Sequence, residues 1–188
     1  MDLICYTQYM KEIEIKARIR HPEEVVKKLE GMGCSFSNSI RQTDTVYTKI
    51  VGNVEEYLTN DHYLRIREKS DGRFVFTFKK PLSKTVLTKA EYETEIKDAK
   101  EFEQALLHMG YKPANKVIKE RRTGYINDIE ICIDEVVGLG SFIEVEKKTD
   151  QDETEVRKEL NSFLDTLGVS VDDQIHKGYD IMAIENKI

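Results

Sequence analysis

Three segments of this chain alternate between acidic and apolar residues, which is typical of a β-strand. Residues 12–16 read EIEIK, residues 91–97 read EYETEIK and residues 144–148 read EVEKK. Because residues two apart lie on the same face of a strand, each segment predicts one ionic face and one apolar face. Glutamate is a poor strand former. Its repeated use therefore indicates that the ionic faces have a function beyond solubility.

Strands and helices alternate along the rest of the chain. Strands are expected at 11–20, 44–50, 63–69, 72–80, 89–96, 116–126, 128–136 and 140–148, and helices at 22–33, 98–110, 152–168 and 178–186. A unit of acid-rich strand, helix and glycine stop recurs along the chain. The predicted fold class is α+β: an antiparallel, eight-stranded, closed or nearly closed β-barrel with helices packed outside it.

Length, charge and cysteine content restrict the class of protein. The chain has 188 residues, a net charge of −6 and a pI of about 5.4, which fits one domain and disfavours nucleic-acid binding. No apolar run reaches the length of a membrane span. Residues 1–9 lack the features of a signal peptide, so we expect a short extension followed by one domain at 10–188. Cys5, Cys34 and Cys132 are too widely spaced for a disulfide framework and indicate a reducing cytoplasm.

Two interpretations of the ionic strand faces compete. In the first, the sheet is ordinary and its charged face is in water. In the second, the apolar faces pack against the helices and the charged faces line a common lumen. The helices need an apolar sheet face, and the strands supply one on one side only, which favours the second interpretation. Enclosed acids and bases suit a polyanion with divalent cations, because bases contact phosphate oxygens and carboxylates hold hard cations.

The ordered segments resemble the CYTH superfamily, the triphosphate tunnel metalloenzymes. EIEIK matches its ExExK signature; LRIR at 64–67, FTFKKP at 76–81, KAEYETEI at 89–96, KERR at 119–122, ICIDEVVGLGSFIEVE at 131–146 and GYDIM at 178–182 follow in the family's order. The resemblance covers roughly residues 10–182. It implies an eight-stranded antiparallel tunnel that binds triphosphate with Mg²⁺ or Mn²⁺.

The resemblance also implies roles for individual residues. The implied metal ligands are Glu12, Glu14, Asp134, Glu144 and Glu146. The implied substrate-binding residues are Lys16, Arg65, Arg67, Lys79, Lys119 and Arg121, and the catalytic set is Glu12, Glu14, Lys119 and Arg121. Glu91, Glu93 and Lys89 on the middle strand are further candidates. The chain departs from the family at Tyr63 and at Tyr47-Thr48, which leaves the base-binding end unassigned.

Members of this family do not share one reaction. They include class IV adenylyl cyclases, inorganic triphosphatases and thiamine triphosphatases. The length of the chain and the segment IDEVVGLGSFIEVE look most like the cyclases. We therefore expect a cytoplasmic enzyme that cyclises ATP to 3′,5′-cyclic AMP and pyrophosphate, without nucleic-acid or membrane partners; a homodimer is left open. A triphosphatase and a non-catalytic module that binds nucleotides or polyphosphate are the alternatives.

Overall fold

In the computed structural model, residues 11–50, 54–59, 62–81 and 89–186 are described. The strands are β1 (Lys11–Arg18), β2 (Ile40–Thr48), β3 (Tyr63–Lys69), β4 (Phe74–Pro81), β5 (Lys89–Ile96), β6 (Lys112–Ile126), β7 (Ile129–Val136) and β8 (Gly140–Thr149). The α-helices are α1 (Pro22–Gly31), α2 (Val54–Leu58), α3 (Ala99–His108), α4 (Glu153–Leu167) and α5 (Tyr179–Glu185), and a 3₁₀ helix covers Val171–Asp173. The predicted extension at residues 1–9 lies outside the described residues.

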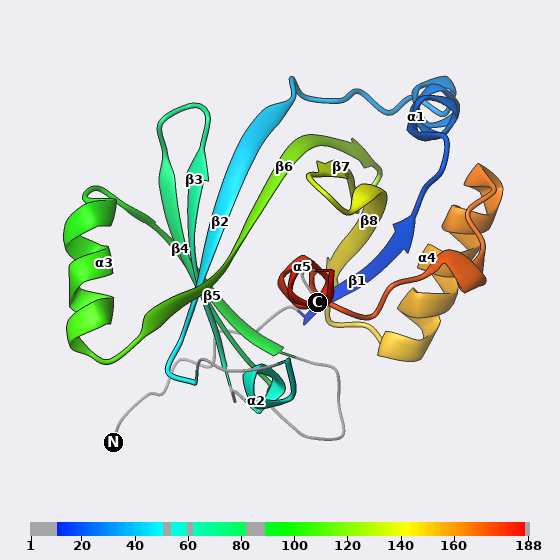
Figure 1. The fold of residues 1–188 in the computed structure, drawn as a ribbon. Helices are drawn as coiled ribbons and strands as arrows, with labels where there is room; N and C mark the ends of the chain where they lie inside the picture. The colour runs from blue at the N-terminus through cyan, green and yellow to red at the C-terminus, as the bar shows by residue number, and fades with distance from the viewer. Residues whose placement is uncertain (1–10, 51–53, 60–61, 82–88, 187–188) are drawn as a thin grey trace, which may run out of the picture. The chain divides into compact units, whose positions relative to one another are not determined.

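The strands form one eight-stranded sheet in the order β1-β8-β7-β6-β2-β3-β4-β5 (Figure 1). The registers of β1 with β8, of β2 with β3 and β6, and of β4 with β3 and β5 are all antiparallel. The predicted α+β class, with eight antiparallel strands and packed helices, is confirmed. None of the helices in the described ranges is long and apolar enough to cross a membrane.

Two strands begin earlier than predicted, and one α-helix was not predicted. β2 begins at Ile40 instead of residue 44, and β6 begins at Lys112 instead of residue 116. Pro113 argues against a strand interior, but proline is tolerated at bulges. The register of β2 with β6 shifts between Val46 and Tyr47, and Tyr47 pairs with Pro113. Helix α2 occupies a stretch for which the sequence predicted neither a helix nor a strand.

The chain divides into two compact units. Unit 1 contains the described residues up to Ser37 together with 123–133 and 142–175. Unit 2 contains 38–122, 134–141 and the described residues from His176 onward. Each unit has its own apolar core. In each unit the core uses the apolar faces of the strands, so the ionic faces are not part of it.

In unit 1, helices α1 and α4 cover the apolar face of the sheet. Ile13 and Ile15 of β1 are buried in one cluster with Leu29 of α1 and Leu160 of α4. The Asp152 side chain caps α4 by accepting hydrogen bonds from the backbone of its first turn, and Gly168 ends the helix in the left-handed region with φ of 79°. The glutamates of β1 therefore project from the face opposite the helices.

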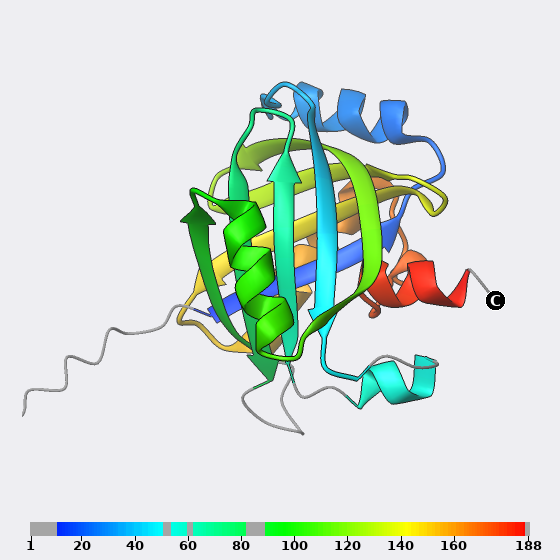
Figure 2. The ribbon, with the colours of Figure 1, turned by 60° about the vertical axis from the view of Figure 1, so that its left-hand side comes forward.

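In unit 2, α3 covers the apolar face. Leu106 of α3 is buried with Leu64 and Ile66 of β3, and Phe102 packs on the same cluster. Figure 2 shows α3, in green, in front of the strands of this unit. The basic residues of β3 alternate with Leu64 and Ile66, so they lie on the other face. In both units the helices pack on the apolar strand faces, as the alternating pattern predicted.

Candidate functional site

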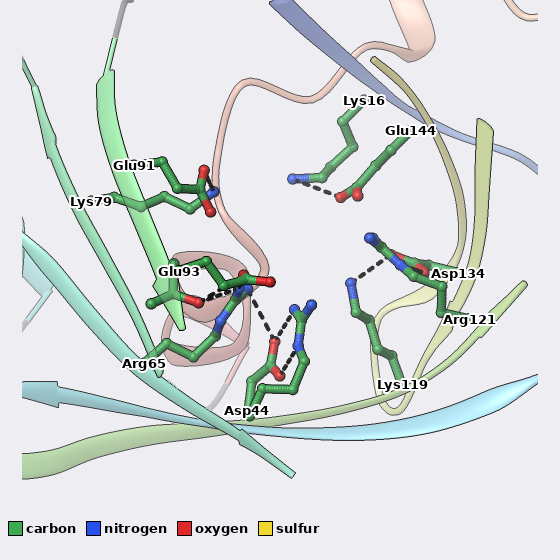
Figure 3. Close-up of polar contacts among 12 residues, drawn as sticks. Lys16, Asp44, Arg65, Lys79, Glu91, Glu93, Lys119, Arg121, Asp134 and Glu144 are labelled. Atoms are coloured by element: carbon green, nitrogen blue, oxygen red, sulfur yellow. Dashed lines mark hydrogen bonds and ion pairs between the residues drawn. The ribbon is translucent and has the colours of Figure 1, made fainter. Parts of the chain in front are cut away.

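The ionic face of unit 2 contains a carboxylate that is paired with two basic side chains. Asp134 of β7 is fully buried and accepts hydrogen bonds from Lys119 Nζ (2.8 Å) and Arg121 Nε (2.6 Å), both on β6 (Figure 3). A second bond from Arg121 reaches the oxygen that Lys119 contacts. Lys119 itself is only 2% exposed. Asp134 therefore fixes both cations in position, and its oxygens are occupied by them.

Asp44 of β2 forms a second buried ionic cluster with the arginines of β3. Arg67 donates bidentately to Asp44 at 2.6 and 2.7 Å, and Arg65 Nη1 lies 3.6 Å from its carboxylate. Burial raises the pKa of Asp44, but the hydrogen bond from Arg67 and the nearby positive charges outweigh it and lower the pKa to about 2. Asp44 thus stays ionised in the folded protein. Asp44 is not among the site residues predicted from the sequence.

Arg65 and Lys79 are paired with the acids of the middle strand. Arg65 Nη2 donates to Thr77 at 2.8 Å and lies 3.4 Å from Glu93 of β5. Lys79 of β4 lies 2.6 Å from Glu91 of β5. The Nε atom of Arg65 is buried without a hydrogen-bond partner among the described residues. An additional acceptor, such as a phosphate oxygen, would satisfy this donor.

Unit 1 contributes the predicted carboxylates of β1 and β8. In the register of these strands Glu14 is opposite Glu146, Glu12 is opposite Lys148, and Lys16 is opposite Glu144. Lys148 lies 2.8 Å from Glu12, and Lys16 lies 3.3 Å from Glu144. Burial, and then the negative charge of Glu12, raise the pKa of Glu146 to about 7. The proximity of the acidic side chains on β1 and β8 therefore disfavours the ionised form of Glu146.

The carboxylates of unit 1 fit a hard divalent cation by their chemistry. Mg²⁺ and Mn²⁺ prefer oxygen ligands, and a cation would neutralise the repulsion that raises the pKa of Glu146. The side chains are not yet gathered around one point: in the part of the chain that the structure describes, no three acidic, histidine or cysteine residues form a ready-made metal site. Holding a cation would thus require side-chain rotation by Glu12, Glu14 or Glu146.

The structure therefore separates the predicted site residues into sets. Arg65, Arg67, Lys79, Glu91, Glu93, Lys119, Arg121 and Asp134 belong to unit 2, whereas Glu12, Glu14, Lys16, Glu144 and Glu146 belong to unit 1. The side chain of Lys89 lies outside the part of the chain that the structure describes. The missed residue Asp44 shares its strand face with Gln42 and Val46, so the strand period places it on a face but does not reveal its partners.

Comparison with known proteins gives one family match. The CYTH domain family matches residues 10–179 of this chain. A protein of Methanocaldococcus jannaschii, named as a candidate adenylate cyclase, is 34% identical over 173 residues, covering 90% of this chain and 97% of its own length.

Solved structures share the fold. The PH1819 protein of Pyrococcus horikoshii OT3 matches with a TM-score of 0.79 and 27% identity over 93% of this chain and 98% of that one. HpAC1 from Hippeastrum, named as a candidate adenylyl cyclase and described as having a dominant triphosphatase activity, matches with a TM-score of 0.62 and covers 95% of each chain. At 14% identity the second likeness concerns the fold alone.

Proposed function

Because this chain belongs to the CYTH domain family, we propose that it is a divalent-metal-dependent enzyme acting on a triphosphate, and that it converts ATP to 3′,5′-cyclic AMP and pyrophosphate. The observation that carries this proposal is the set of buried and half-buried basic side chains on the ionic face of unit 2, each paired with a carboxylate. The relative from Methanocaldococcus jannaschii, named as a candidate adenylate cyclase, supports the choice of reaction.

Lys119, Arg121, Arg65 and Lys79 are the residues that we propose to bind the phosphates. Asp134 fixes Lys119 and Arg121 before any substrate arrives, so little side-chain freedom is lost on binding. Arg65 has a buried donor that a phosphate oxygen would satisfy. Arg67 donates two bonds to Asp44 and we assign it to holding that carboxylate. When phosphate binds, Lys79 and Arg65 would give up their contacts with Glu91 and Glu93 and contact phosphate oxygens instead.

In the proposed reaction the ribose 3′-hydroxyl loses its proton to solvent, and its oxygen attacks the α-phosphorus of ATP. The bond from this phosphorus to the oxygen that bridges to the β-phosphate breaks, and the electron pair leaves with pyrophosphate. Negative charge therefore grows on the leaving group. Lys119 and Arg121 are cations with fixed positions, and such groups stabilise developing charge without reorganising.

Glu12, Glu14 and Glu146 are the residues that we propose to hold the divalent cation, with Glu144 as a further carboxylate paired to Lys16. Such a cation, when bound, neutralises phosphate charge and makes the 3′-hydroxyl easier to deprotonate. In the absence of a cation, Lys148 and Lys16 partly balance these acids by their ion pairs with Glu12 and Glu144.

A triphosphatase is the second candidate, in which water attacks the terminal phosphorus. HpAC1 has the same fold, and a protein with a cyclase name can thus have a dominant triphosphatase activity. The same anchored cations would serve that reaction, because both reactions displace a phosphate at a charged triphosphate chain.

Product identity distinguishes these candidates. We would incubate the protein with ATP, inorganic triphosphate and thiamine triphosphate, with Mg²⁺ or Mn²⁺, and identify products by mass. Cyclic AMP together with pyrophosphate is the expected result. Much faster phosphate release from inorganic triphosphate, with no cyclic nucleotide, would establish the triphosphatase instead. Tight binding of triphosphate without turnover would establish a binding module.

We further propose that residues 10–188 act as one domain, because the family match at 10–179 runs across both units. A cytoplasmic location is part of the same proposal. Cys34 and Cys132, the cysteines in the described ranges, are buried and form no disulfide, which suits a reducing compartment.

A further inference from the structure

The segment Gly178-Tyr179-Asp180, at the start of α5, contacts the ionic face of unit 2. The Tyr57 hydroxyl of α2 donates to Asp180 Oδ2 at 2.5 Å. Asn115 of β6 donates from Nδ2 to the backbone oxygen of Asp180 at 2.9 Å. Helix α5 is thereby tied to both α2 and β6, at a residue that is only 9% exposed.

A side chain at Gly178 would displace the carboxylate of Asp180. A Cβ atom at Gly178 would lie 2.2 Å from Asp180 Oδ1, a distance that no relaxed side chain accepts. The carboxylate of Asp180 therefore lies over Gly178, two residues earlier, while it accepts from Tyr57. Tyr179 is the residue between Gly178 and Asp180.

Tyr179 lies against one of the cations assigned above to phosphate binding. Lys119 Nζ is 5.0 Å from the centre of the Tyr179 ring and 2.8 Å from Asp134 Oδ2. Tyr179 is 9% exposed and Lys119 is 2% exposed. An ammonium over an aromatic ring is attracted to the ring face, and the attraction is greater where water is excluded. Lys119 thus has an aromatic contact as well as a carboxylate contact.

We propose that Tyr179 is a positioning residue for Lys119, and that Tyr57 and Asp180 hold Tyr179 in place. This inference rests on the proposed function. The carboxylate of Asp134 and the ring of Tyr179 both contact the ammonium of the flexible lysine side chain, so the ring restricts its position further. The Lys119 ammonium is then held in the position from which it would contact the phosphates.

The Tyr57–Asp180 contact suits a permanent anchor. Burial, and then the negative charge of Asp180 and its hydrogen bond, raise the pKa of Tyr57 above its ordinary value. Tyr57 therefore remains a protonated donor throughout the neutral range. The contact joins residues 123 positions apart in the chain, so it fixes α5 by tertiary structure and not by local turns.

A pair of variants at Tyr179 tests the role of its ring. Tyr179→Leu removes the aromatic face, whereas Tyr179→Phe keeps it. We expect kcat/KM for the preferred triphosphate to fall roughly tenfold in Tyr179→Leu and to stay within about twofold of wild type in Tyr179→Phe. Tyr92→Leu is the matched control, because Tyr92 is exposed on β5 and lies on the strand face that carries Thr94 and Ile96. It should leave kcat/KM unchanged.

Double variants separate positioning from loss of stability. In a Lys119→Met background, Tyr179→Leu should cost no further activity; in a Tyr179→Leu background, Tyr57→Phe should cost none. Equal losses in Tyr179→Phe and Tyr179→Leu, or additive losses with Lys119→Met, would overturn the proposal. So would full activity in Tyr179→Leu. A wild-type protein that neither binds nor converts any triphosphate would instead overturn the proposed function, and this inference with it.

Discussion

Glu14 of β1 and Glu146 of β8 lie directly opposite each other in the antiparallel register of their strands. Like charges in that arrangement destabilise a strand pair. Burial and the additional negative charge of Glu12 raise the pKa of Glu146 to about 7. A bound divalent cation would offset this repulsion, which links the strand register to the proposed metal dependence.

Magnesium should therefore stabilise the protein in the absence of any nucleotide. At about pH 8, where Glu146 is ionised, saturating Mg²⁺ should raise Tm by roughly 5–10 °C. Glu146→Gln and Glu14→Gln should lose most of this rise and most of the turnover, as measured by thermal unfolding and product assay. Glu155→Gln is the control, because Glu155 is an exposed residue of α4. An equal Mg²⁺ effect in all these proteins would contradict the carboxylate site.

The anchored cations should contribute to phosphate affinity and not to adenosine affinity. Arg65→Ala and Lys79→Ala should each weaken binding of inorganic triphosphate by roughly 1.5–3 kcal/mol, because each removes a charge-assisted contact. Calorimetry with triphosphate and with adenosine measures the difference. Arg73→Ala is a matched control, since Arg73 directly precedes β4 but its side chain is 50% exposed. If Arg73→Ala weakened triphosphate binding as much as Arg65→Ala, the effect would be one of net charge.

Asp44→Asn should destabilise unit 2 in a pH-dependent manner. The folded-state pKa of Asp44 is lowered from 3.8 to about 2, so its carboxylate contributes stability above the unfolded value, and this contribution is lost as pH falls through the folded value. At neutral pH the variant should lose about 3–5 kcal/mol, because Arg67 is left buried without its carboxylate. The difference from wild type should shrink below about pH 4. Urea unfolding across this range measures it; a difference that grew toward low pH would be inconsistent with an ionised Asp44.

The faces of the strands could be predicted from sequence because the strand period does not depend on the partners of a strand. Ile13 and Ile15 are buried and Glu12 and Glu14 are exposed, as the alternation in EIEIK indicated. The helices on the apolar faces followed from the same pattern, since an apolar sheet face must be covered.

Asp44 could not be assigned in this way. β2 was predicted to begin at this residue, whereas it begins four residues earlier, at Ile40. Its role depends on the register that places it opposite Arg67 of β3, and that register is set by long-range pairing. The contact of Tyr179 with Lys119 likewise depends on tertiary structure, since the two residues belong to α5 and β6.

The structure and the family resemblance indicate different roles for Asp134. The resemblance implies a metal ligand, whereas its oxygens here accept bonds from Lys119 and Arg121. If Asp134 positions these cations, Asp134→Asn should lower the affinity for inorganic triphosphate at least tenfold and leave the Mg²⁺-induced rise in Tm unchanged. Calorimetry and thermal unfolding of the same variant give both quantities, and Glu155→Gln, which removes an exposed carboxylate, serves as the control for charge. Loss of the Mg²⁺ effect with triphosphate affinity retained would return Asp134 to the metal site. A variant that lost both would show that the carboxylate serves the cations and the metal together, because the anchoring role alone leaves the carboxylates of β1 and β8 untouched.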